Sequence, residues 1–186
     1  MEPEVDQKHP PPQHQVFINF RGDQLRNNFI SHLVKALKGH GINVFIDTYE
    51  QKGKDIKNLF KRIEESRLAL AVFSTRYTES TWCLEELVNI KNRVDLGTLE
   101  VLPIFYKVPT ASVKQLVGEF GDHFRRRECE YRHEQPKIER WKKALECVTG
   151  KLGFTMDEKR YYESLDSFKN AYICVYLLIK LCSYFK

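Results

Sequence analysis

The chain has 186 residues, of which 42% are hydrophobic and 30% charged, a mixture that is typical of a globular domain and excludes a disordered chain. Its formal net charge of +5 suits anionic ligands but is too small to demand a nucleic-acid partner. The five cysteines are scattered, without a CxxC pair or metal-ligand spacing, so we expect free thiols in a reducing compartment and no metal site.

The N-terminal part of the chain divides into a polar leader, a strand and a helix. Residues 1–13 are proline-rich and lack the apolar stretch of a secretory signal, so we expect a disordered leader and a cytoplasmic protein, with the nucleus as a second location. The run Val16–Phe20, rich in β-branched and aromatic residues, predicts a strand. Apolar residues then recur at helical spacing over residues 25–37, and Gly39 and Gly41 end this helix.

The middle of the chain continues to alternate strands with helices. Residues 43–46 predict a second strand, and the unbroken apolar run Leu68–Phe73 predicts a strand buried on both faces of a parallel sheet. The other predicted elements are a helix around residues 56–63, a helix over residues 83–94 with N-cap candidates Thr78, Ser80 and Thr81, a strand at residues 99–106, a short helix near residues 120–124 and a last helix over residues 136–150.

This alternation predicts an α/β fold with a parallel sheet covered by helices on both faces. The expected strand order is the flavodoxin-like 2-1-3-4-5, in which ligands bind at the carboxyl ends of the strands. The tail, residues 155–186, ends in an apolar stretch that would form a helix of roughly 22 Å, too short for a hydrocarbon core of about 30 Å. We therefore expect it to pack on the domain or on a partner, and only its contact with a membrane surface stays open.

The sequence lacks the motifs of several functions that occur on this architecture. No GxGxxG follows the first strand, and no P-loop or GxSxG elbow occurs. The third strand ends in Phe73-Ser74-Thr75, where a phospho-acceptor receiver domain would have an aspartate. What remains is a set of polar segments that follow the predicted strands.

Two of these segments are loops. The loop after the first strand contains two arginines around a glycine, and arginine can hold a phosphate bidentately. Taken alone, this loop is better explained as a solvated connection between strand and helix. The loop over residues 47–55 is long enough to be a flap or an interaction loop, or else a plain surface turn. The candidate ligand-binding residues are Arg21, Gly22, Asp23, Gln24, Leu25 and Arg26 in the first loop and Lys52 and Gly53 in the second.

The third segment is the start of the helix over residues 83–94. Helical periodicity places Glu85 roughly opposite the apolar face, so we expect it to be solvated. Glu86 falls on the flank of that face, beside Trp82 and near the strand ends. A carboxylate next to an aromatic ring is a candidate site residue, and the alternative is a boundary glutamate favoured by the helix N-terminus.

At these residues the sequence resembles the plant Toll/interleukin-1 receptor (TIR) family. The resemblance covers about residues 14–154, which we take as the domain, and its motifs are specific when they occur together in this order. The matching segments are Val-Phe-Ile-Asn-Phe-Arg-Gly at residues 16–22, Ser-His-Leu at 31–33, Gly-Ile-Asn-Val-Phe-Ile-Asp at 41–47, Ile-Glu-Glu-Ser-Arg at 63–67, Trp-Cys-Leu-Glu-Glu-Leu at 82–87 and Leu-Pro-Ile-Phe-Tyr at 102–106.

The resemblance implies a five-stranded flavodoxin-like fold and an NAD+ hydrolase that acts in plant immune and cell-death signalling. It implies Glu86 as the catalytic residue, NAD+ as substrate without a further cofactor, and ADP-ribose or cyclic ADP-ribose variants as products. It also implies self-association through the first and last helices, with Ser31 and His32 at the interface, and a site that the loop around Gly53 completes in the assembly.

The chemistry of NAD+ suits a carboxylate. Nicotinamide leaves as a neutral molecule, so its departure needs no general acid, and the positive charge that develops on the ribose is stabilised by a nearby carboxylate. In this reading Arg21 and Arg26 hold the diphosphate, and Trp82 stacks on the nicotinamide or forms a wall of the pocket.

A second hypothesis is a catalytically weak module that joins other TIR proteins. It is motivated by loops that differ from the family pattern: this chain has Arg-Gly-Asp-Gln-Leu-Arg at residues 21–26, where relatives usually have Arg-Gly-Glu-Asp-Thr-Arg. The basic residues between 52 and 62 are explained by the solvated face of a helix, so we expect no nucleic-acid partner. We also expect a chain with the TIR domain alone.

Overall fold

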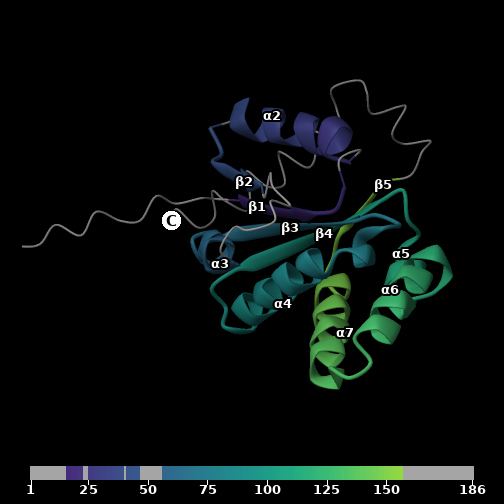
Figure 1. The fold of residues 1–186 in the computed structure, drawn as a ribbon. Coiled ribbons are helices and arrows are strands. Elements are labelled where there is room, and N and C mark those ends of the chain that lie inside the picture. The colour runs from purple at the N-terminus through teal and green to yellow at the C-terminus, as the bar shows by residue number, and fades with distance from the viewer. Residues whose placement is uncertain (1–15, 23–24, 40, 47–55, 157–186) are drawn as a thin grey trace, which may run out of the picture.

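Five parallel strands form one sheet in the order β2-β1-β3-β4-β5 (Figure 1). The computed structural model of the chain describes residues 16–22, 25–39, 41–46 and 56–156. Both the α/β class and the flavodoxin-like strand order are therefore confirmed. The strands are β1 (Val16–Phe20), β2 (Val44–Ile46), β3 (Leu68–Phe73), β4 (Glu100–Tyr106) and β5 (Phe154–Met156).

The helices follow the predicted alternation, although the first predicted helix is divided into η1 and α2 and the short turn η2 was not predicted. A separate six-residue helix, α5, lies in a stretch predicted as loop, and α6 is longer than the short helix predicted there. In α5 only Val113 is buried, so these six residues carry no periodic apolar face from which a helix could be predicted. The helices are η1, a π-helical turn (Arg26–Ile30), α2 (Ser31–Gly39), α3 (Ile56–Glu64), the 3₁₀ turn η2 (Tyr77–Glu79), α4 (Thr81–Asp95), α5 (Thr110–Gln115), α6 (Gly118–Glu130) and α7 (Gln135–Thr149).

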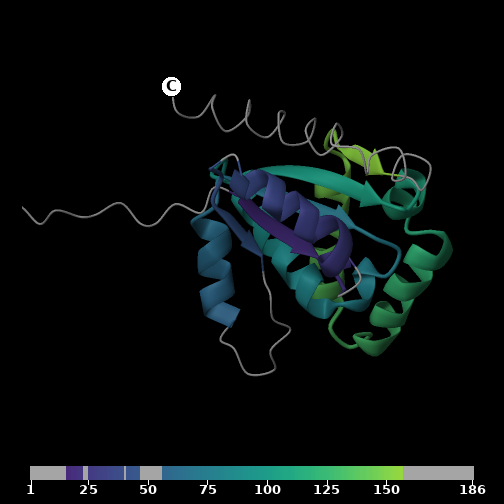
Figure 2. The same cartoon turned by 90° about the horizontal axis from the view of Figure 1, so that it is seen from above.

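Helices cover both faces of the sheet, as Figures 1 and 2 show. On one face, η1 and α2 pack on alternate side chains of β1 and β3, including Ile18 and Leu70. On the other face, α4, α6 and α7 pack on the intervening side chains, such as Ala71 and Phe73. Every residue of β3 is buried, as its unbroken apolar run predicted. The carboxyl ends of β1, β3 and β4 therefore converge at one edge of the sheet between the two helical layers.

The last strand crosses residue 154, which we took as the end of the domain, since β5 runs over Phe154–Met156. β5 pairs with β4 in parallel, with Phe154 opposite Ile104 and Met156 opposite Tyr106. The predicted leader, the loop over residues 47–55 and the tail beyond residue 156 lie outside the described residues. None of the helices within the described ranges is both long and apolar enough to cross a bilayer.

The turn between α5 and α6 gives the first testable prediction. Leu116 adopts a left-handed conformation with φ of 52°, and a Cβ added at Gly121 would lie 2.0 Å from its carbonyl oxygen. Because backbone cannot yield as a side chain can, we expect Gly121→Ala to lower the free energy of unfolding by about 3 kcal/mol in urea denaturation. The control is Gly39→Ala, where nothing lies within 4 Å and stability should change by less than about 1 kcal/mol. Equal unfolding midpoints for the two variants would contradict this packing.

Candidate functional site

Glu86 lies in the first turns of α4, against the end of β1. The helix starts because the side chain of Ser80 caps it, accepting a hydrogen bond of 3.2 Å from the backbone N–H of Cys83. Periodicity then turns Glu86 toward the sheet, where only 2% of its surface is exposed. The residue predicted on the flank of the apolar face is thus inside the protein, and a buried carboxylate needs polar partners.

Those partners come from β1 and η2. Asn19, fully buried on β1, donates a hydrogen bond of 2.5 Å from Nδ2 to Oε2 of Glu86. The Tyr77 hydroxyl, also buried, donates to Oδ1 of Asn19. The backbone carbonyl of Cys83 accepts from both groups, at 3.2 Å from the Tyr77 hydroxyl and 3.3 Å from Nδ2 of Asn19. A buried series of hydrogen bonds, Tyr77–Asn19–Glu86, therefore fixes the carboxylate in place.

The protonation of Tyr77 determines which groups donate and which accept in this series of hydrogen bonds. Burial raises the pKa of Tyr77 well above its ordinary value of 10.0, and the nearby Cys83 and Glu86 act in the same direction. The hydroxyl therefore keeps its proton and donates. Because Oδ1 of Asn19 accepts from this hydroxyl, the amide N–H₂ end points to Glu86.

A small cavity, which we call the Glu86 pocket, opens beside this carboxylate. It has a volume of about 20 Å³, enough for about one water molecule. The structure brings three of the predicted site residues to it besides Glu86, and leaves Arg21 and Leu25 out. The described lining consists of Ile18, Phe20, Gly22, Arg26, Trp82, Cys83 and Glu86.

The neighbouring Glu85 corrects one expectation. We predicted a solvated side chain, but Glu85 is half-buried and its Oε1 accepts a hydrogen bond of 3.0 Å from the indole N–H of Trp141. The periodicity of α4 alone could not show this, because Trp141 belongs to α7, which packs along α4. Glu85 therefore ties two helices together and is separate from the Glu86 pocket.

Arg21 lies in a second, larger hollow, which we call the arginine pocket. Its volume is about 500 Å³, and it lies where β1, β3 and β4 end. Gly22, whose φ of 98° favours glycine, is shared with the Glu86 pocket. The described lining consists of Arg21, Gly22, Leu25, Asn28, Ser74, Thr75, Arg76, Tyr106 and Lys107.

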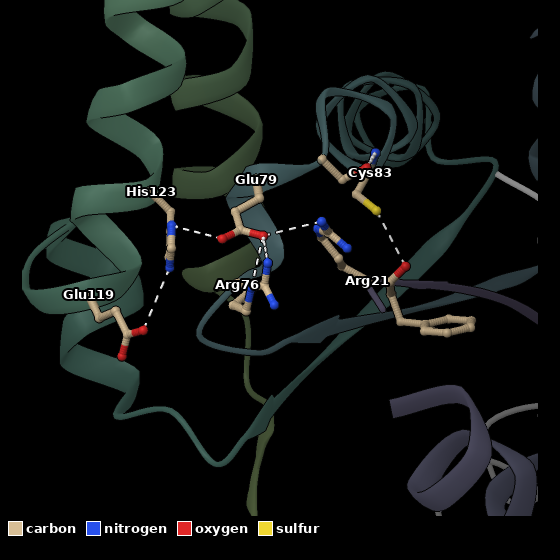
Figure 3. A network of polar contacts seen from close by, with 8 residues as sticks. Arg21, Arg76, Glu79, Cys83, Glu119 and His123 are labelled. Carbon is tan, nitrogen blue, oxygen red and sulfur yellow. Dashed lines mark hydrogen bonds and ion pairs between the residues drawn. The ribbon is translucent and has the colours of Figure 1, made fainter. Parts of the chain in front are cut away.

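Glu79 of η2 contacts the two arginines of this pocket, as Figure 3 shows. Its Oε2 lies 3.2 Å from Nη2 of Arg21 and 2.8 Å from Nη2 of Arg76, and Arg76 Nε also donates to it at 2.9 Å. Its Oε1 lies 3.0 Å from Nδ1 of the buried His123 on α6. Nε2 of His123 in turn lies 3.7 Å from the exposed Glu119. One carboxylate thus joins the loop after β1, the turn after β3 and a helix.

The pKa of Glu79 gives a second testable prediction. Desolvation acts to raise this pKa, but the hydrogen bond from Arg76 and the neighbouring positive charges outweigh it and lower the pKa below its ordinary value of 4.5. A lowered carboxyl pKa stabilises the fold above about pH 4.5, and this contribution is lost as the pH falls through the folded value. We expect Glu79→Gln to lower the free energy of unfolding by about 1.5 kcal/mol at neutral pH and to flatten its decline in acid.

Urea denaturation between pH 3 and pH 7 measures this effect. The matched control is Glu139→Gln, since Glu139 is exposed and lies 4.0 Å from Lys142, a pair of the kind that contributes little. If Glu79→Gln and Glu139→Gln gave the same pH profile, Glu79 would have no special role in stability.

The remaining predicted residues fall into two groups. Asp23, Gln24, Lys52 and Gly53 lie outside the described residues. Ser31 and His32 are exposed on α2, where the Ser31 hydroxyl donates to the backbone carbonyls of Asn27 and Asn28 at 3.1 and 2.8 Å. Within the described part of the chain, no three His, Cys, Asp or Glu side chains are grouped to hold a metal ion.

Asn19 and Tyr77 were missed by the sequence reasoning. Asn19 is the one polar residue in the run Val-Phe-Ile-Asn-Phe, and an amide in an otherwise apolar strand must find hydrogen-bond partners. That signal was visible. Tyr77 gave none, because its partner lies 58 residues away in the sequence.

Comparison with known proteins shows the family to which the chain is related. The sequence model of the TIR domain matches residues 13–165. The chain is 52% identical over 150 residues to vesicle-associated protein 1-4 and 52% identical over 149 residues to disease resistance protein RPS4, both from Arabidopsis thaliana. These matches cover 81% and 80% of this chain but only 26% and 12% of those proteins.

A solved structure gives the same result. The TIR domains of the activated Roq1 resistosome, which directly recognises the pathogen effector XopQ, superpose with a TM-score of 0.72 at 35% identity. The match covers 90% of this chain and 98% of the Roq1 chain.

Proposed function

Because the chain belongs to the TIR domain family and is related to plant disease resistance proteins, we propose that it is an NAD+ hydrolase of defence signalling. The observation that supports this most is the buried Glu86 carboxylate, held by Asn19 beside a cavity at the sheet edge where such folds bind ligands. In this proposal Glu86 is the catalytic residue, and Gly22, Arg26 and Trp82 form the walls around the reacting ribose.

The proposed reaction breaks the bond between C1′ of the ribose and the nicotinamide nitrogen. The electron pair of this bond goes to the ring nitrogen, so nicotinamide leaves neutral and the ribose becomes an oxocarbenium ion. The Glu86 carboxylate stabilises this cation, and its burial strengthens the interaction because few water dipoles screen it. Water then adds to C1′ and loses a proton, which gives ADP-ribose, or a group of the same molecule adds and gives a cyclic product.

Asn19 is a positioning residue in this mechanism. Its amide directs Oε2 of Glu86, and Tyr77 fixes the orientation of that amide. A carboxylate that is already oriented need not reorganise when positive charge develops on the substrate.

The size of the Glu86 pocket bears on the alternative function. A volume of about 20 Å³ is far too small for NAD+, and in this proposal the site is completed in the assembly of copies. The same observation favours the alternative of a weakly catalytic TIR–TIR interaction module. The two functions differ in one measurable product: concentrated protein incubated with NAD+ releases nicotinamide in the first case, and none above a blank in the second.

Dependence on assembly gives a third testable prediction. Ser31 and His32 are exposed on α2, and truncating them removes only local contacts of the folded chain. If α2 forms the interface between copies, Ser31→Ala with His32→Ala will shift the protein toward monomer and lower nicotinamide release per chain by about tenfold, since losing roughly 1.4 kcal/mol of association weakens it tenfold. Light scattering and the release assay measure both effects at one protein concentration.

The control for this prediction is Arg126→Ala, an exposed position on α6, a helix outside the expected interface. The melting temperatures of all three proteins should agree. An unchanged mass and unchanged release in the double variant would show that this part of α2 is not an interface.

A further inference from the structure

We propose that His123 is a proton-controlled positioning residue, whose charge sets how firmly Glu79 holds the segment after β1 against α6. His123 lies on α6, and only 7% of its surface is exposed. Figure 3 shows the ring facing Glu79, with Nδ1 3.0 Å from Oε1. The other oxygen of the same carboxylate contacts Arg21 and Arg76. A proton on His123 therefore acts on the segment after β1 through one side chain.

Histidine is the only residue type in this network that ordinarily changes charge between pH 5 and pH 8. Burial acts to raise the pKa of Glu79, but the hydrogen bond from Arg76 and the neighbouring positive charges outweigh it and lower this pKa below 4.5. The hydrogen bond with Glu79 raises the pKa of Arg76, so this guanidinium stays charged, and arginine in general does not lose its proton in proteins. A change of charge in this pH range therefore falls on His123.

The ring of His123 has carboxylates on two sides. Nδ1 faces Glu79 of η2, and Nε2 lies 3.7 Å from Glu119, one turn earlier on α6. Arg127, one turn later on this helix, pairs with another glutamate of α6. The helix α5 also packs on α6, and its one charged side chain, Lys114, is exposed. Among the described residues, the ion-pair partners of the ring are therefore two carboxylates.

The number of protons on the ring determines how it meets these carboxylates. Carboxylate oxygens only accept hydrogen bonds, and a neutral imidazole has one N–H where the protonated ring has two. Both ring nitrogens are buried and make no hydrogen bond of good geometry, so their contact with Glu79 and Glu119 depends on charge. The protonated ring attracts both carboxylates, whereas the neutral ring leaves a buried nitrogen without an N–H beside one of them.

Loss of the proton therefore weakens the contact between α6 and Glu79. The carboxylate keeps its arginine partners on Oε2, but η2 and the segment after β1 lose their charged contact with α6. Gly22 directly follows Arg21 and lines both pockets, so its backbone reports on this contact. In the proposed hydrolysis, a less firmly held Gly22 leaves the wall of the Glu86 pocket less well ordered. This last step alone rests on the proposed function.

NMR spectroscopy of the full chain between pH 5 and pH 8 tests the proposal without NAD+. We expect the amide resonance of Gly22 to shift with the same midpoint as the ring of His123. His123→Gln, which is neutral at every pH, should abolish this shift. If that variant did not fold, Glu79→Gln should abolish the shift of Gly22 while the ring still titrates. The matched control is His133→Gln, an exposed histidine between α6 and α7, in which Gly22 should respond as in the wild type.

Nicotinamide release gives a second readout. The ratio of release by the wild type to release by His123→Gln should be at least about twofold larger at pH 5 than at pH 8, the scale of one ion pair. A chain that released no nicotinamide would refute the proposed hydrolysis and leave the NMR test intact. The proposal is overturned if the Gly22 resonance of the wild type does not change between pH 5 and pH 8, if it changes identically in His123→Gln, or if His133→Gln abolishes the change.

Discussion

Replacing Glu86 with glutamine is expected to lower kcat for nicotinamide release by at least about a hundredfold, the effect of removing one preorganised group that stabilises transition-state charge. Glutamine has the same shape, and its carbonyl oxygen can still accept the hydrogen bond from Asn19. The fold and the KM should therefore change little. What is lost is the negative charge opposite the developing oxocarbenium ion.

The matched control is Glu85→Gln, one residue earlier on the same helix. Its side chain accepts a hydrogen bond from Trp141, which a glutamine carbonyl can also accept, and it does not line the Glu86 pocket. We expect activity and melting temperature close to those of the wild type. Equal nicotinamide release by the Glu85 and Glu86 variants would exclude Glu86 as the catalytic residue.

Replacing Asn19 with leucine is expected to have the second-largest effect. Leucine has a similarly branched side chain but cannot donate to Glu86 or accept from Tyr77, so a buried hydroxyl and a buried carboxylate lose a partner. We expect the free energy of unfolding to fall by about 2 kcal/mol. We also expect kcat to fall about tenfold or more with KM nearly unchanged, because the carboxylate is no longer held in one orientation.

The division between kcat and KM separates positioning from simple loss of folded protein. Partial unfolding lowers the concentration of active protein. Urea denaturation gives the folded fraction, and the measured activity can be corrected for it. Tyr77→Phe removes the contacts of the hydroxyl with Asn19 and with the carbonyl of Cys83, which lie further from the carboxylate, and should show the same pattern with a smaller loss. If the activity of the Asn19 variant fell only in proportion to its folded fraction, the chain Tyr77–Asn19–Glu86 would have a structural role alone.

The sequence predicted the strand order and most of the elements because hydrophobic periodicity and β-branched runs are local signals. The run Leu68–Phe73 reads as a buried strand without knowledge of its neighbours. The angle of each residue on one helix likewise favours Glu86 over Glu85 as the candidate site residue. The error on Glu85 arose because its partner Trp141 lies on another helix.

The candidate site also has features that the sequence could not predict. Arg26 lines the Glu86 pocket, whereas Arg21 lines the arginine pocket. The sequence could not predict this difference, because both arginines fall in one short predicted loop. Their separation depends on the positive φ of Gly22, on the π-helical turn that follows, and on the contact of Arg21 with Glu79. These are three-dimensional features that single residue types do not encode.

The most direct test of the central claim is nicotinamide release from NAD+ by the wild-type chain, measured over a wide range of protein concentration. The account predicts release above the blank that rises more steeply than linearly with concentration, because the Glu86 pocket of one chain is too small for NAD+ and, in this proposal, a second copy completes the site. Absence of nicotinamide at every concentration, from protein shown to be folded and assembled, would contradict the proposed hydrolysis and leave the interaction module as the function.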